Sequence, residues 1–508
     1  MPYAITQLCC TDASCVTACP VNCIHPTPDE PDFGTTDMLY VDPRTCIDCG
    51  ACAEVCPVDA VFPAETLTGA LADYPAVNAE YFAGTEPAAP PAGSPLFHAW
   101  GPVRFDRVLP ADFPDLDVAV VGSGPAGMYT VQDLLLHTTA RVTLYDRLPV
   151  AGGLVRFGVA PDHPDTKRIG ESFARYHDHH RLRLRLDTEV GRDIGVEELG
   201  HRHDAVVYAV GAPTARDLGI PGERLPGHLP STTVVGWYNG HPEIAAHAVP
   251  VDAEDAARVA VVGTGNVALD IARILTADPD RLAGTAIHTA ALGRLRASRV
   301  REVVLLGRRG PEHAAYTRGE LTALLHREDL EVVVDDRDPR VGRAIDTAAP
   351  GDHAALLRDV PRCRPEDTPP AAGRRRVVLR FHATPRALLG DGHVSGVRVD
   401  GPDGPDELPA GLVVRAIGHR GRPLTGLPFD DETGTVPHDA GRVEGRPGTY
   451  VVGWIKRGPG GGIGTNRRDA AETVASLIED GKNRVIGPRP RRGGVLRRAA
   501  HRGSSRAT

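Results

Sequence analysis

Cysteine placement is the feature that most constrains this chain. Nine of the ten cysteines lie within the first 56 of 508 residues, and the tenth is Cys363. The first residues, MPYAITQLCC, show neither the basic nor the apolar segment of a secretory signal. In a long chain of this kind, clustered cysteines favour metal binding over a disulfide framework. The amino-terminal part is therefore expected to be a small module built around thiolate ligands.

The second group of cysteines has the spacing C-x₂-C-x₂-C-x₃-C-P and runs from Cys46 to Pro57. In this bacterial iron–sulfur run, three thiolates on one tight loop bind one cluster and the fourth binds the other cluster. Zinc sites are not normally built on this spacing. The sequence therefore predicts an iron–sulfur module.

The first group of cysteines reads C-x₂-D-x₂-C-x₃-C-P, so that Asp12 stands where the second cysteine ligand is expected. The crossover of the fourth cysteine divides the ligands into two sets. The first set has three cysteines, with Asp12 or nothing at the fourth iron: Cys9, Cys15 and Cys56. The second set has four cysteines: Cys46, Cys49, Cys52 and Cys19. We predict one [4Fe-4S] cluster and one [3Fe-4S] or labile [4Fe-4S] cluster.

Two cysteines of the module are left over. Cys10, beside Cys9, is interpreted as a spare thiol, with the fourth ligand of the first cluster as the alternative. Cys23 is interpreted as a neighbour of a cluster rather than a ligand. Over about residues 1–65 the module resembles the bacterial two-cluster and seven-iron ferredoxins.

The charge is unevenly distributed along the chain. Residues 1–75 carry eleven acidic side chains and one basic side chain, Arg44, whereas the remainder carries 55 acidic and 56 basic residues. A small acidic module on a near-neutral body favours an electrostatically steered carrier, with a merely solvated acidic surface as the alternative. No window approaches eighteen consecutive apolar residues. We expect a cytoplasmic protein with no membrane span and no nucleic-acid partner.

From Asp117 onward, short β-branched runs alternate with helical stretches, which predicts a parallel α/β sheet. The predicted strands are Asp117–Val121, Ala140–Tyr145, Ala205–Val210, Arg258–Val262 and Glu302–Leu306. Two of these strands lead into glycine-rich turns about 140 residues apart. The body of the chain is therefore expected to contain two nucleotide-binding units.

The first turn is a complete G-x-G-x-x-G fingerprint, made by Gly122, Gly124 and Gly127 between a strand and a helix. These glycines permit the tight turn, the approach of the backbone to a pyrophosphate, and the packing of helix on strand. Asp146 ends the next strand, where a carboxylate binds a ribose hydroxyl. This unit is expected to bind FAD.

The second turn contains Gly263, Gly265 and Ala268, and its next strand ends in Arg308-Arg309 without a carboxylate. Paired guanidiniums bind a 2′-phosphate that a carboxylate would repel. This unit is therefore expected to bind NADP(H), with a solvated turn as the alternative for the arginines. A third glycine-rich segment precedes a helix predicted at 468–478. A helix start of this kind suits the flavin or its phosphates, unless the segment is only a flexible loop.

Residues 117–480 resemble the adrenodoxin-reductase-type ferredoxin–NADP reductases. The segments that carry the resemblance are VVGSGPAGMYT, GLVRFGVAPDHP, GWYNGHPE, VVGTGNVALDIARIL, VREVVLLGRRGP and GWIKRGPGGGIGT. The resemblance implies FAD contacts at Ala126, Asp146, Leu154, Val190, Trp454, Gly461, Gly462 and Ile463. It implies NADP(H) contacts at Thr264, Gly265, Asn266, Val267, Arg308, Arg309, Glu320 and Gly461. It also matches His163 and Asp270 to a pair near the flavin that manages protons, with a structural role as the alternative for His163.

The predicted fold class is an α+β ferredoxin module followed by an α/β flavoprotein with two dinucleotide-binding domains, similar to glutathione reductase. The ferredoxin module is placed at residues 1–75 and a Pro- and Gly-rich linker at 76–115. The FAD domain is placed at 116–220 and 396–485, and the NADP domain at 221–395. Residues 486–508, with seven arginines and no acid, are expected to form a flexible basic tail.

The resemblance implies a ferredoxin–NADP(+) reductase fused to its own ferredoxin. Hydride would pass from NADPH to FAD, and single electrons to the clusters and an external acceptor such as a P450 or a ferredoxin. The alternative is an electron-donating flavin and iron–sulfur subunit of a larger complex, like the small subunit of glutamate synthase. A disulfide reductase would need a cysteine pair in the nucleotide domains, where Cys363 is alone.

Overall fold

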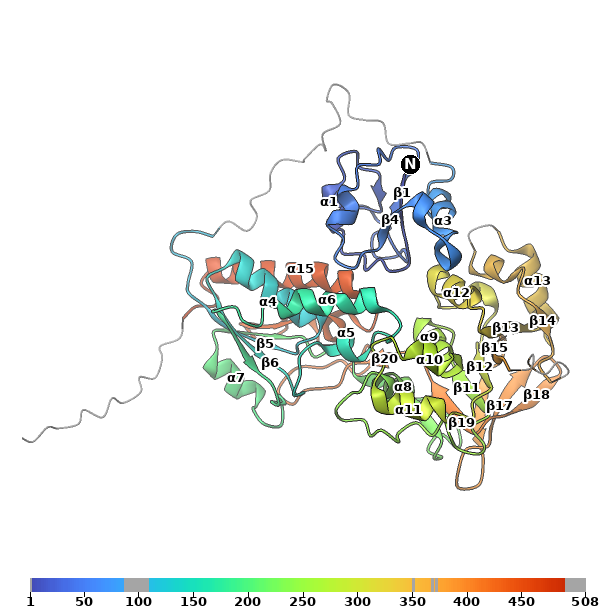
Figure 1. The fold of residues 1–508 in the computed structure, drawn as a ribbon. Helices are drawn as coiled ribbons and strands as arrows, with labels where there is room; N and C mark the ends of the chain where they lie inside the picture. The colour runs from blue at the N-terminus through green and yellow to red at the C-terminus, as the bar shows by residue number, and fades with distance from the viewer. Residues whose placement is uncertain (1, 86–108, 350–351, 367–369, 371–372, 489–508) are drawn as a thin grey trace, which may run out of the picture.

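The structure is a computed structural model that describes residues 2–85, 109–349, 352–366, 370 and 373–488. Figure 1 shows a small amino-terminal module, in blue, beside two larger α/β units that together form the body. The Pro-rich part of the predicted linker, at 86–95, and the basic tail from residue 489 lie outside the described residues. Among the described helices, none combines the length and apolar composition that a membrane crossing needs.

The amino-terminal module is built on two antiparallel strand pairs with short helices between them. Strand β1 (Tyr3–Ile5) pairs with β4 (Val61–Pro63), and β2 (Ile24–His25) pairs with β3 (Tyr40–Val41). The helices are α1 (Ser14–Ala18), α2 (Ala51–Glu54), the 3₁₀ turns Ala64–Thr66 and Gly69–Leu71, and α3 (Tyr74–Tyr81).

Helix α3 belongs to this module, so the boundary predicted after residue 75 is wrong. Its buried Asn78 accepts hydrogen bonds from the amides of Ile5 and Val41 at 3.1 and 2.8 Å, and donates to the Ile5 carbonyl at 2.8 Å. One side chain thus joins α3 to both strand pairs. Such an anchor leaves no periodic signal, because it is a single polar residue that acts across 73 positions of sequence.

The FAD-type unit has a seven-stranded sheet in the order β21-β22-β23-β8-β5-β6-β7. Its strands are β5 (Asp117–Val121), β6 (Arg141–Tyr145), β7 (Leu182–Arg185), β8 (Ala205–Tyr208), β21 (His438–Asp439), β22 (Arg442–Val443) and β23 (Thr449–Val451). Helices α4 (Pro125–His137) and α15 (Ile463–Lys482) cover one face side by side (Figure 1). Helix α7 (Val196–Arg202) covers the other face. Because both faces are covered, Val118 to Val121 are all buried, as in an internal parallel strand.

The NADP-type unit has a second seven-stranded sheet in the order β10-β19-β11-β12-β15-β13-β14. Its strands are β10 (His228–Pro230), β11 (Arg258–Val262), β12 (Glu302–Leu306), β13 (Leu330–Asp335), β14 (Arg362–Cys363), β15 (Arg375–Arg380) and β19 (Leu412–Arg415). Its helices are α8 (Ser231–Tyr238), α9 (Asn266–Thr276), α10 (Pro279–Leu282), α11 (Thr289–Arg296), α12 (Arg318–Leu325), α13 (Pro339–Thr347) and the 3₁₀ turns Pro311–His313 and His353–Leu357.

A small antiparallel sheet packs on this unit and corrects a second predicted boundary. Strands β16 (Pro385–Leu389), β17 (Gly396–Gly401) and β18 (Gly404–Pro409) share an apolar core with β11, β12 and β15. The next strand, β19, lies inside the large sheet, parallel to β11. The boundary predicted after residue 395 therefore falls within the NADP-type unit. The strands after it read as ordinary apolar runs, and only long-range pairing assigns them to a sheet.

The chain crosses between the two units twice, and the crossings lie together. Strand β9 (Thr214–Ala215) leaves the FAD-type unit and pairs antiparallel with β20 (His419–Arg420), which returns to it. Three short helices complete the FAD-type unit: α5 (Gly153–Phe157), α6 (Pro164–Ala174) and α14 (Trp454–Arg457).

Candidate functional site

The two glycine-rich turns occupy equivalent places at the carboxyl ends of β5 and β11. A Cβ atom at Gly122 would overlap the Ala209 carbonyl, and one at Gly263 would overlap the Ala416 carbonyl. Helices α4 and α9 begin directly after these turns, and no side chain caps either helix. Their free amides fit a dinucleotide phosphate, which is what the two turns are predicted to bind.

Asp146 lies beside the first turn, as expected for a ribose-binding carboxylate. Its Oδ2 accepts from the Ser123 amide at 2.8 Å and from the Ser123 hydroxyl, and its Oδ1 accepts from the Leu148 amide at 2.9 Å. The Asp146 carboxylate is therefore fixed by three local donors.

The other residues predicted to contact FAD surround the same turn. The start of α5 packs on Gly124, which brings Leu154 to the turn, and Gly453 packs on Ala126. Leu154 is 49% exposed, whereas Val190 is buried beside Val121 and Tyr145. Gly461, Gly462 and Ile463 lead into α15.

Helix α14 and helix α15 are joined by a buried ion pair that the sequence analysis missed. Lys456 of α14 donates to Asp469 of α15 at 2.5 Å, and Asp469 also accepts from the Gly453 amide at 2.5 Å. Trp454 Nε1, at the start of α14, is buried without a hydrogen-bond partner among the described residues. An orphaned donor beside a dinucleotide turn fits a flavin oxygen or nitrogen as its acceptor.

The residues predicted to contact NADP(H) lie at the starts of α9 and α12. Thr264, Gly265 and Val267 belong to the turn and the first residues of α9. Asn266 accepts from the amide of Thr317, the residue that caps α12, at 2.8 Å, which ties the two helix starts together. Arg308 and Arg309 follow β12 and are exposed. Their position and charge fit a 2′-phosphate.

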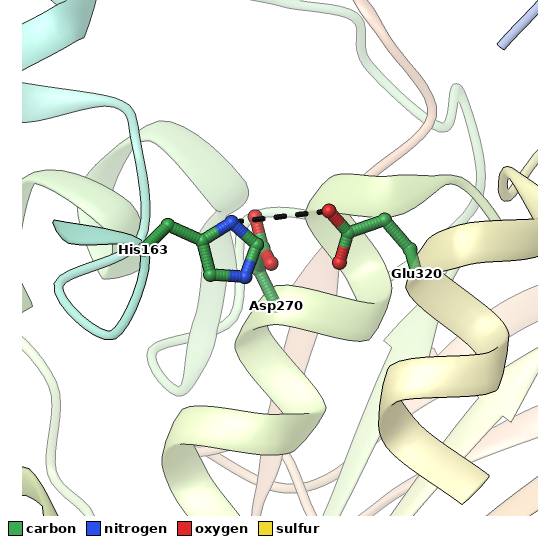
Figure 2. Close-up of side chains that lie close together, drawn as sticks. All are labelled: His163, Asp270 and Glu320. Carbon is green, nitrogen blue, oxygen red and sulfur yellow. Dashed lines mark ion pairs between the residues drawn. The ribbon is translucent and has the colours of Figure 1, made fainter. Parts of the chain in front are cut away.

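Figure 2 shows His163, from the loop that precedes α6, converging with Asp270 of α9 and Glu320 of α12, where the two units meet. The centre of this cluster is Arg273, which the sequence analysis missed. Its guanidinium donates to Asp162 at 2.8 and 3.0 Å and to Asp270 at 2.8 Å. The sequence does contain one signal for this ion pair, because Arg273 lies three residues after Asp270 on a predicted helix.

The position of Arg273 fixes the imidazole of His163. Arg273 Nη2 lies 2.8 Å from His163 Nε2, and a guanidinium can only donate, so Nε2 accepts. The neutral imidazole then carries its proton on Nδ1, which lies 3.8 Å from Glu320 Oε1. Burial, and next the charge of Asp270, raise the pKa of Glu320. The arrangement can hold a proton between His163 and Glu320, and the guanidinium at its centre disfavours a metal ion there.

The predicted cluster ligands form two groups in the module. Cys9, Cys15 and Cys56 lie near Asp12, whereas Cys46, Cys49 and Cys52 lie near Cys19. Backbone amides point at the sulfurs, from Thr11 to Cys9 at 3.4 Å and from Ala60 to Cys56 at 3.2 Å. Burial raises the pKa of Cys9 and of Cys52 to about 12. Thiolates so deprived of water fit a positively charged iron partner.

The two remaining cysteines lie apart from each other. Cys23 Sγ is 3.4 Å from Cys19 Sγ, beside the second group. Cys10 is buried in the apolar core that contains Ala126 and Tyr129 of the FAD-type unit. Its thiol therefore helps to join the module to the body.

The module docks on the body through the loop that carries the first group. The Gly464 amide, in the first turn of α15, donates to the Cys10 carbonyl at 2.7 Å. Acidic residues of the module meet arginines of the body: Asp12 with Arg467, Asp59 with Arg168, and Glu80 with Arg318. Part of the excess acidic charge of the module therefore lies at its interface with the body.

A cavity of about 100 Å³ lies at this interface. It is lined on one side by Cys9, Cys10 and Thr11, and on the other by Gly461, Gly462 and Thr465. A predicted cluster ligand and two predicted flavin contacts therefore line the same space.

Comparisons with known proteins agree with this geometry. A family model of the 4Fe-4S dicluster domain matches residues 8–60, and a model of the pyridine nucleotide-disulphide oxidoreductases matches residues 116–291. A probable ferredoxin/ferredoxin–NADP reductase of Mycobacterium tuberculosis is 46% identical over 504 residues, which covers 94% of this chain and 84% of the relative. The chain belongs to the ferredoxin/ferredoxin–NADP reductases. It is an FAD- and NADPH-dependent oxidoreductase with an amino-terminal 4Fe-4S dicluster domain.

Two further proteins are similar to about three quarters of this chain. The human mitochondrial NADPH:adrenodoxin oxidoreductase is 40% identical over 399 residues, covering 73% of this chain and 81% of the relative. The structure of Mycobacterium tuberculosis FprA in complex with NADPH is 40% identical, with a TM-score of 0.65, over 74% of this chain and 87% of FprA. The predicted fold class and enzyme class are confirmed.

Proposed function

We propose that electrons from NADPH pass through FAD into the cluster of Cys9, Cys15 and Cys56, which lies beside Asp12, and leave through the cluster of Cys19, Cys46, Cys49 and Cys52. When bound, FAD accepts a hydride, and the clusters accept electrons singly. The observation that carries the proposal is the bond from Gly464 to Cys10. It joins the neighbour of a predicted cluster ligand to the neighbour of Ile463, a predicted flavin contact.

The exposure of the two cysteine groups supports the order of transfer. Cys9 and Cys15 face the docking interface or the interior, whereas Cys49 is exposed. Ile47 and Val55, on either side of Cys49 in sequence, are 47% and 43% exposed. An external ferredoxin or P450 would therefore take electrons at the second group.

The body residues have separate tasks in this proposal. Arg308 and Arg309 bind the 2′-phosphate of NADPH, and Asp146 binds the FAD ribose. His163 and Glu320 hold a proton at the junction of the two units, with His163 oriented by Arg273. The first cluster is of the [3Fe-4S] or labile [4Fe-4S] type, because Asp12 replaces a thiolate with a hard ligand.

The test of the route is Gly464→Ala. The added Cβ would overlap the backbone of Cys10, Thr11 and Asp12, which cannot yield as a flexible side chain can, so the module must move. Reduction of cytochrome c with NADPH should fall at least about tenfold. Displacing the module changes its position relative to the flavin site, and the rate of transfer between two groups depends strongly on how they are positioned. Reduction of ferricyanide, which takes electrons directly from the flavin, should be unchanged.

Gly293→Ala is the matched control, because a Cβ at this helical glycine meets nothing within 4 Å. A chain that begins at residue 109 should behave like Gly464→Ala with ferricyanide and lose cytochrome c reduction until ferredoxin is added. Unchanged cytochrome c reduction in both Gly464→Ala and the shortened chain would refute the internal route.

A further inference from the structure

Asp12 stands in the position of a cluster ligand, yet its carboxylate is already occupied. Its Oδ2 accepts from Arg467 Nη1 at 2.8 Å and from the Ser14 hydroxyl, and its Oδ1 lies 3.4 Å from the Ser14 amide. Arg467 also donates to the Ser14 hydroxyl at 2.6 Å. The side chain of Asp12 is 8% exposed, so water does not compete strongly for it.

The arginine that holds Asp12 comes from the reductase body. Arg467 lies on α15, one turn after Gly464, the residue that bonds to Cys10. The same helix therefore carries the predicted flavin contact, the docking bond and the group that binds the odd ligand of the first cluster.

We propose that Arg467 is a positioning residue that withholds the Asp12 carboxylate from the fourth iron, so that the docked first cluster is held in its three-iron form. The inference rests on the ligand set proposed above for the first cluster. The charge-assisted hydrogen bond from Arg467 fixes the orientation of the Asp12 carboxylate and weakens it as an electron donor, so turning it toward iron costs that bond. The Ser14 hydroxyl accepts from Arg467 and donates to Asp12, so it also helps to fix the position of the carboxylate.

The iron exchange that Arg467 opposes is balanced as follows. The oxidised [3Fe-4S] cluster, of charge +1, takes one electron from NADPH through FAD, or from dithionite, and becomes neutral. Addition of one Fe²⁺ then gives a [4Fe-4S] cluster of charge +2. In that step the Asp12–Arg467 ion pair breaks, a carboxylate-to-iron bond forms, and no proton is transferred.

The experiment is a ferrous-iron titration of the full-length protein under dithionite, with the remaining three-iron fraction measured by Mössbauer spectroscopy. EPR of the oxidised protein gives the starting three-iron signal. In Arg467→Ala the Fe²⁺ concentration at half conversion should be about tenfold lower than in the wild type, the scale of one hydrogen bond to a charged group.

Arg468→Ala is the matched control. Arg468 is the next residue on α15 and lies 5.5 Å from the Phe33 ring across the same interface. The Arg468→Ala change removes a contact across the same interface but leaves Arg467 bound to Asp12, so its titration should match the wild type. In an Asp12→Ala background, Arg467→Ala should have no effect, because there is no carboxylate to release.

Three results would overturn the proposal. They are a wild-type protein with only inert four-iron clusters, an Arg467→Ala titration equal to the wild type, and an Arg468→Ala titration shifted as far as that of Arg467→Ala. The last would mean that docking, and not the ion pair, controls the cluster. Failure of the electron route appears separately: cytochrome c reduction would be unchanged in Gly464→Ala, while Arg467→Ala would still shift the iron titration.

Discussion

The two nucleotide-binding units share one local design and differ in the residues that follow the adjacent strand. In each, a buried parallel strand runs into a glycine whose Cβ would overlap a neighbouring carbonyl, and an uncapped helix follows. In each, the adjacent strand pairs residue for residue, Val121 with Tyr145 and Val262 with Leu306. The residues that follow are Asp146 in one unit and Gly307-Arg308 in the other.

Under the proposed function, this difference lets one backbone serve two dinucleotides. Asp146 is fixed by Ser123 and Leu148 and presents a negative charge close to the turn. Arg308 and Arg309 extend from the same place into solvent and present positive charge. Under the function proposed above, the turn binds phosphate in both units, and the end of the second strand distinguishes ribose from 2′-phosphoribose.

The largest expected effect comes from the third glycine of the first turn. A Cβ at Gly127 would overlap the Gly122 carbonyl, a backbone contact that no rotamer change relieves. Gly127→Ala should weaken FAD binding by roughly a hundredfold, the upper end of overpacking costs. Absorbance spectra should show iron–sulfur absorption with little flavin in the purified protein.

Gly200→Ala provides the control in the same unit, since a Cβ at this α7 glycine meets nothing within 4 Å. Full flavin content in Gly127→Ala would mean that α4 can shift away from the turn to make room for the methyl group. Steric overlap would then not explain why the first turn has glycine at this position.

A smaller effect is expected at the arginines. Arg308→Leu should raise the KM for NADPH about tenfold, because one hydrogen bond to a phosphate is lost at an exposed site. The kinetics with NADH should not change, since NADH has no 2′-phosphate. Arg301→Leu, at the opposite end of β12, should leave both coenzymes unaffected. Equal kcat/KM for NADH and NADPH in the wild type would contradict the assignment.

The sequence alone predicted the strands and helices that have a clear local pattern of apolar residues. The strands at Asp117–Val121, Arg258–Val262 and Glu302–Leu306 occur with the predicted bounds. The helix predicted at 468–478 begins earlier, at Ile463. Its first turn contains Gly464, and a glycine-rich sequence is typical of a loop. The bond from Gly464 to Cys10 of the module is not visible in the sequence. Such a contact joins segments more than 450 residues apart, which no local pattern can reveal.

The same limit applies to the candidate site. His163 and Asp270 were predicted from a resemblance, and the structure brings them together with Glu320. Arg273, which orders the cluster, looked like an ordinary helical arginine until Asp162 and His163 were placed against it. The Lys456–Asp469 pair was missed for the same reason, since a buried charge is recognised only by its partner.

The smallest expected effect tests the third position of the second turn, where Ala268 stands in place of glycine. Its methyl group is fully buried in the core that also contains Trp237. Ala268→Gly should lower the free energy of unfolding of this unit by about 1–2 kcal/mol, from lost helix propensity and one lost buried methyl group.

Urea unfolding followed by the fluorescence of Trp237, which is 2% exposed, measures the change. The KM for NADPH should stay within about twofold of the wild type, because the free amides at the start of α9 keep their places. The asymmetry is then complete: the first turn cannot accept a methyl group, whereas the second can lose one at modest cost. If Ala268→Gly instead lost NADPH binding as fully as Gly127→Ala loses FAD, the third position would act on the cofactor itself, and close packing would not explain why the two units differ there.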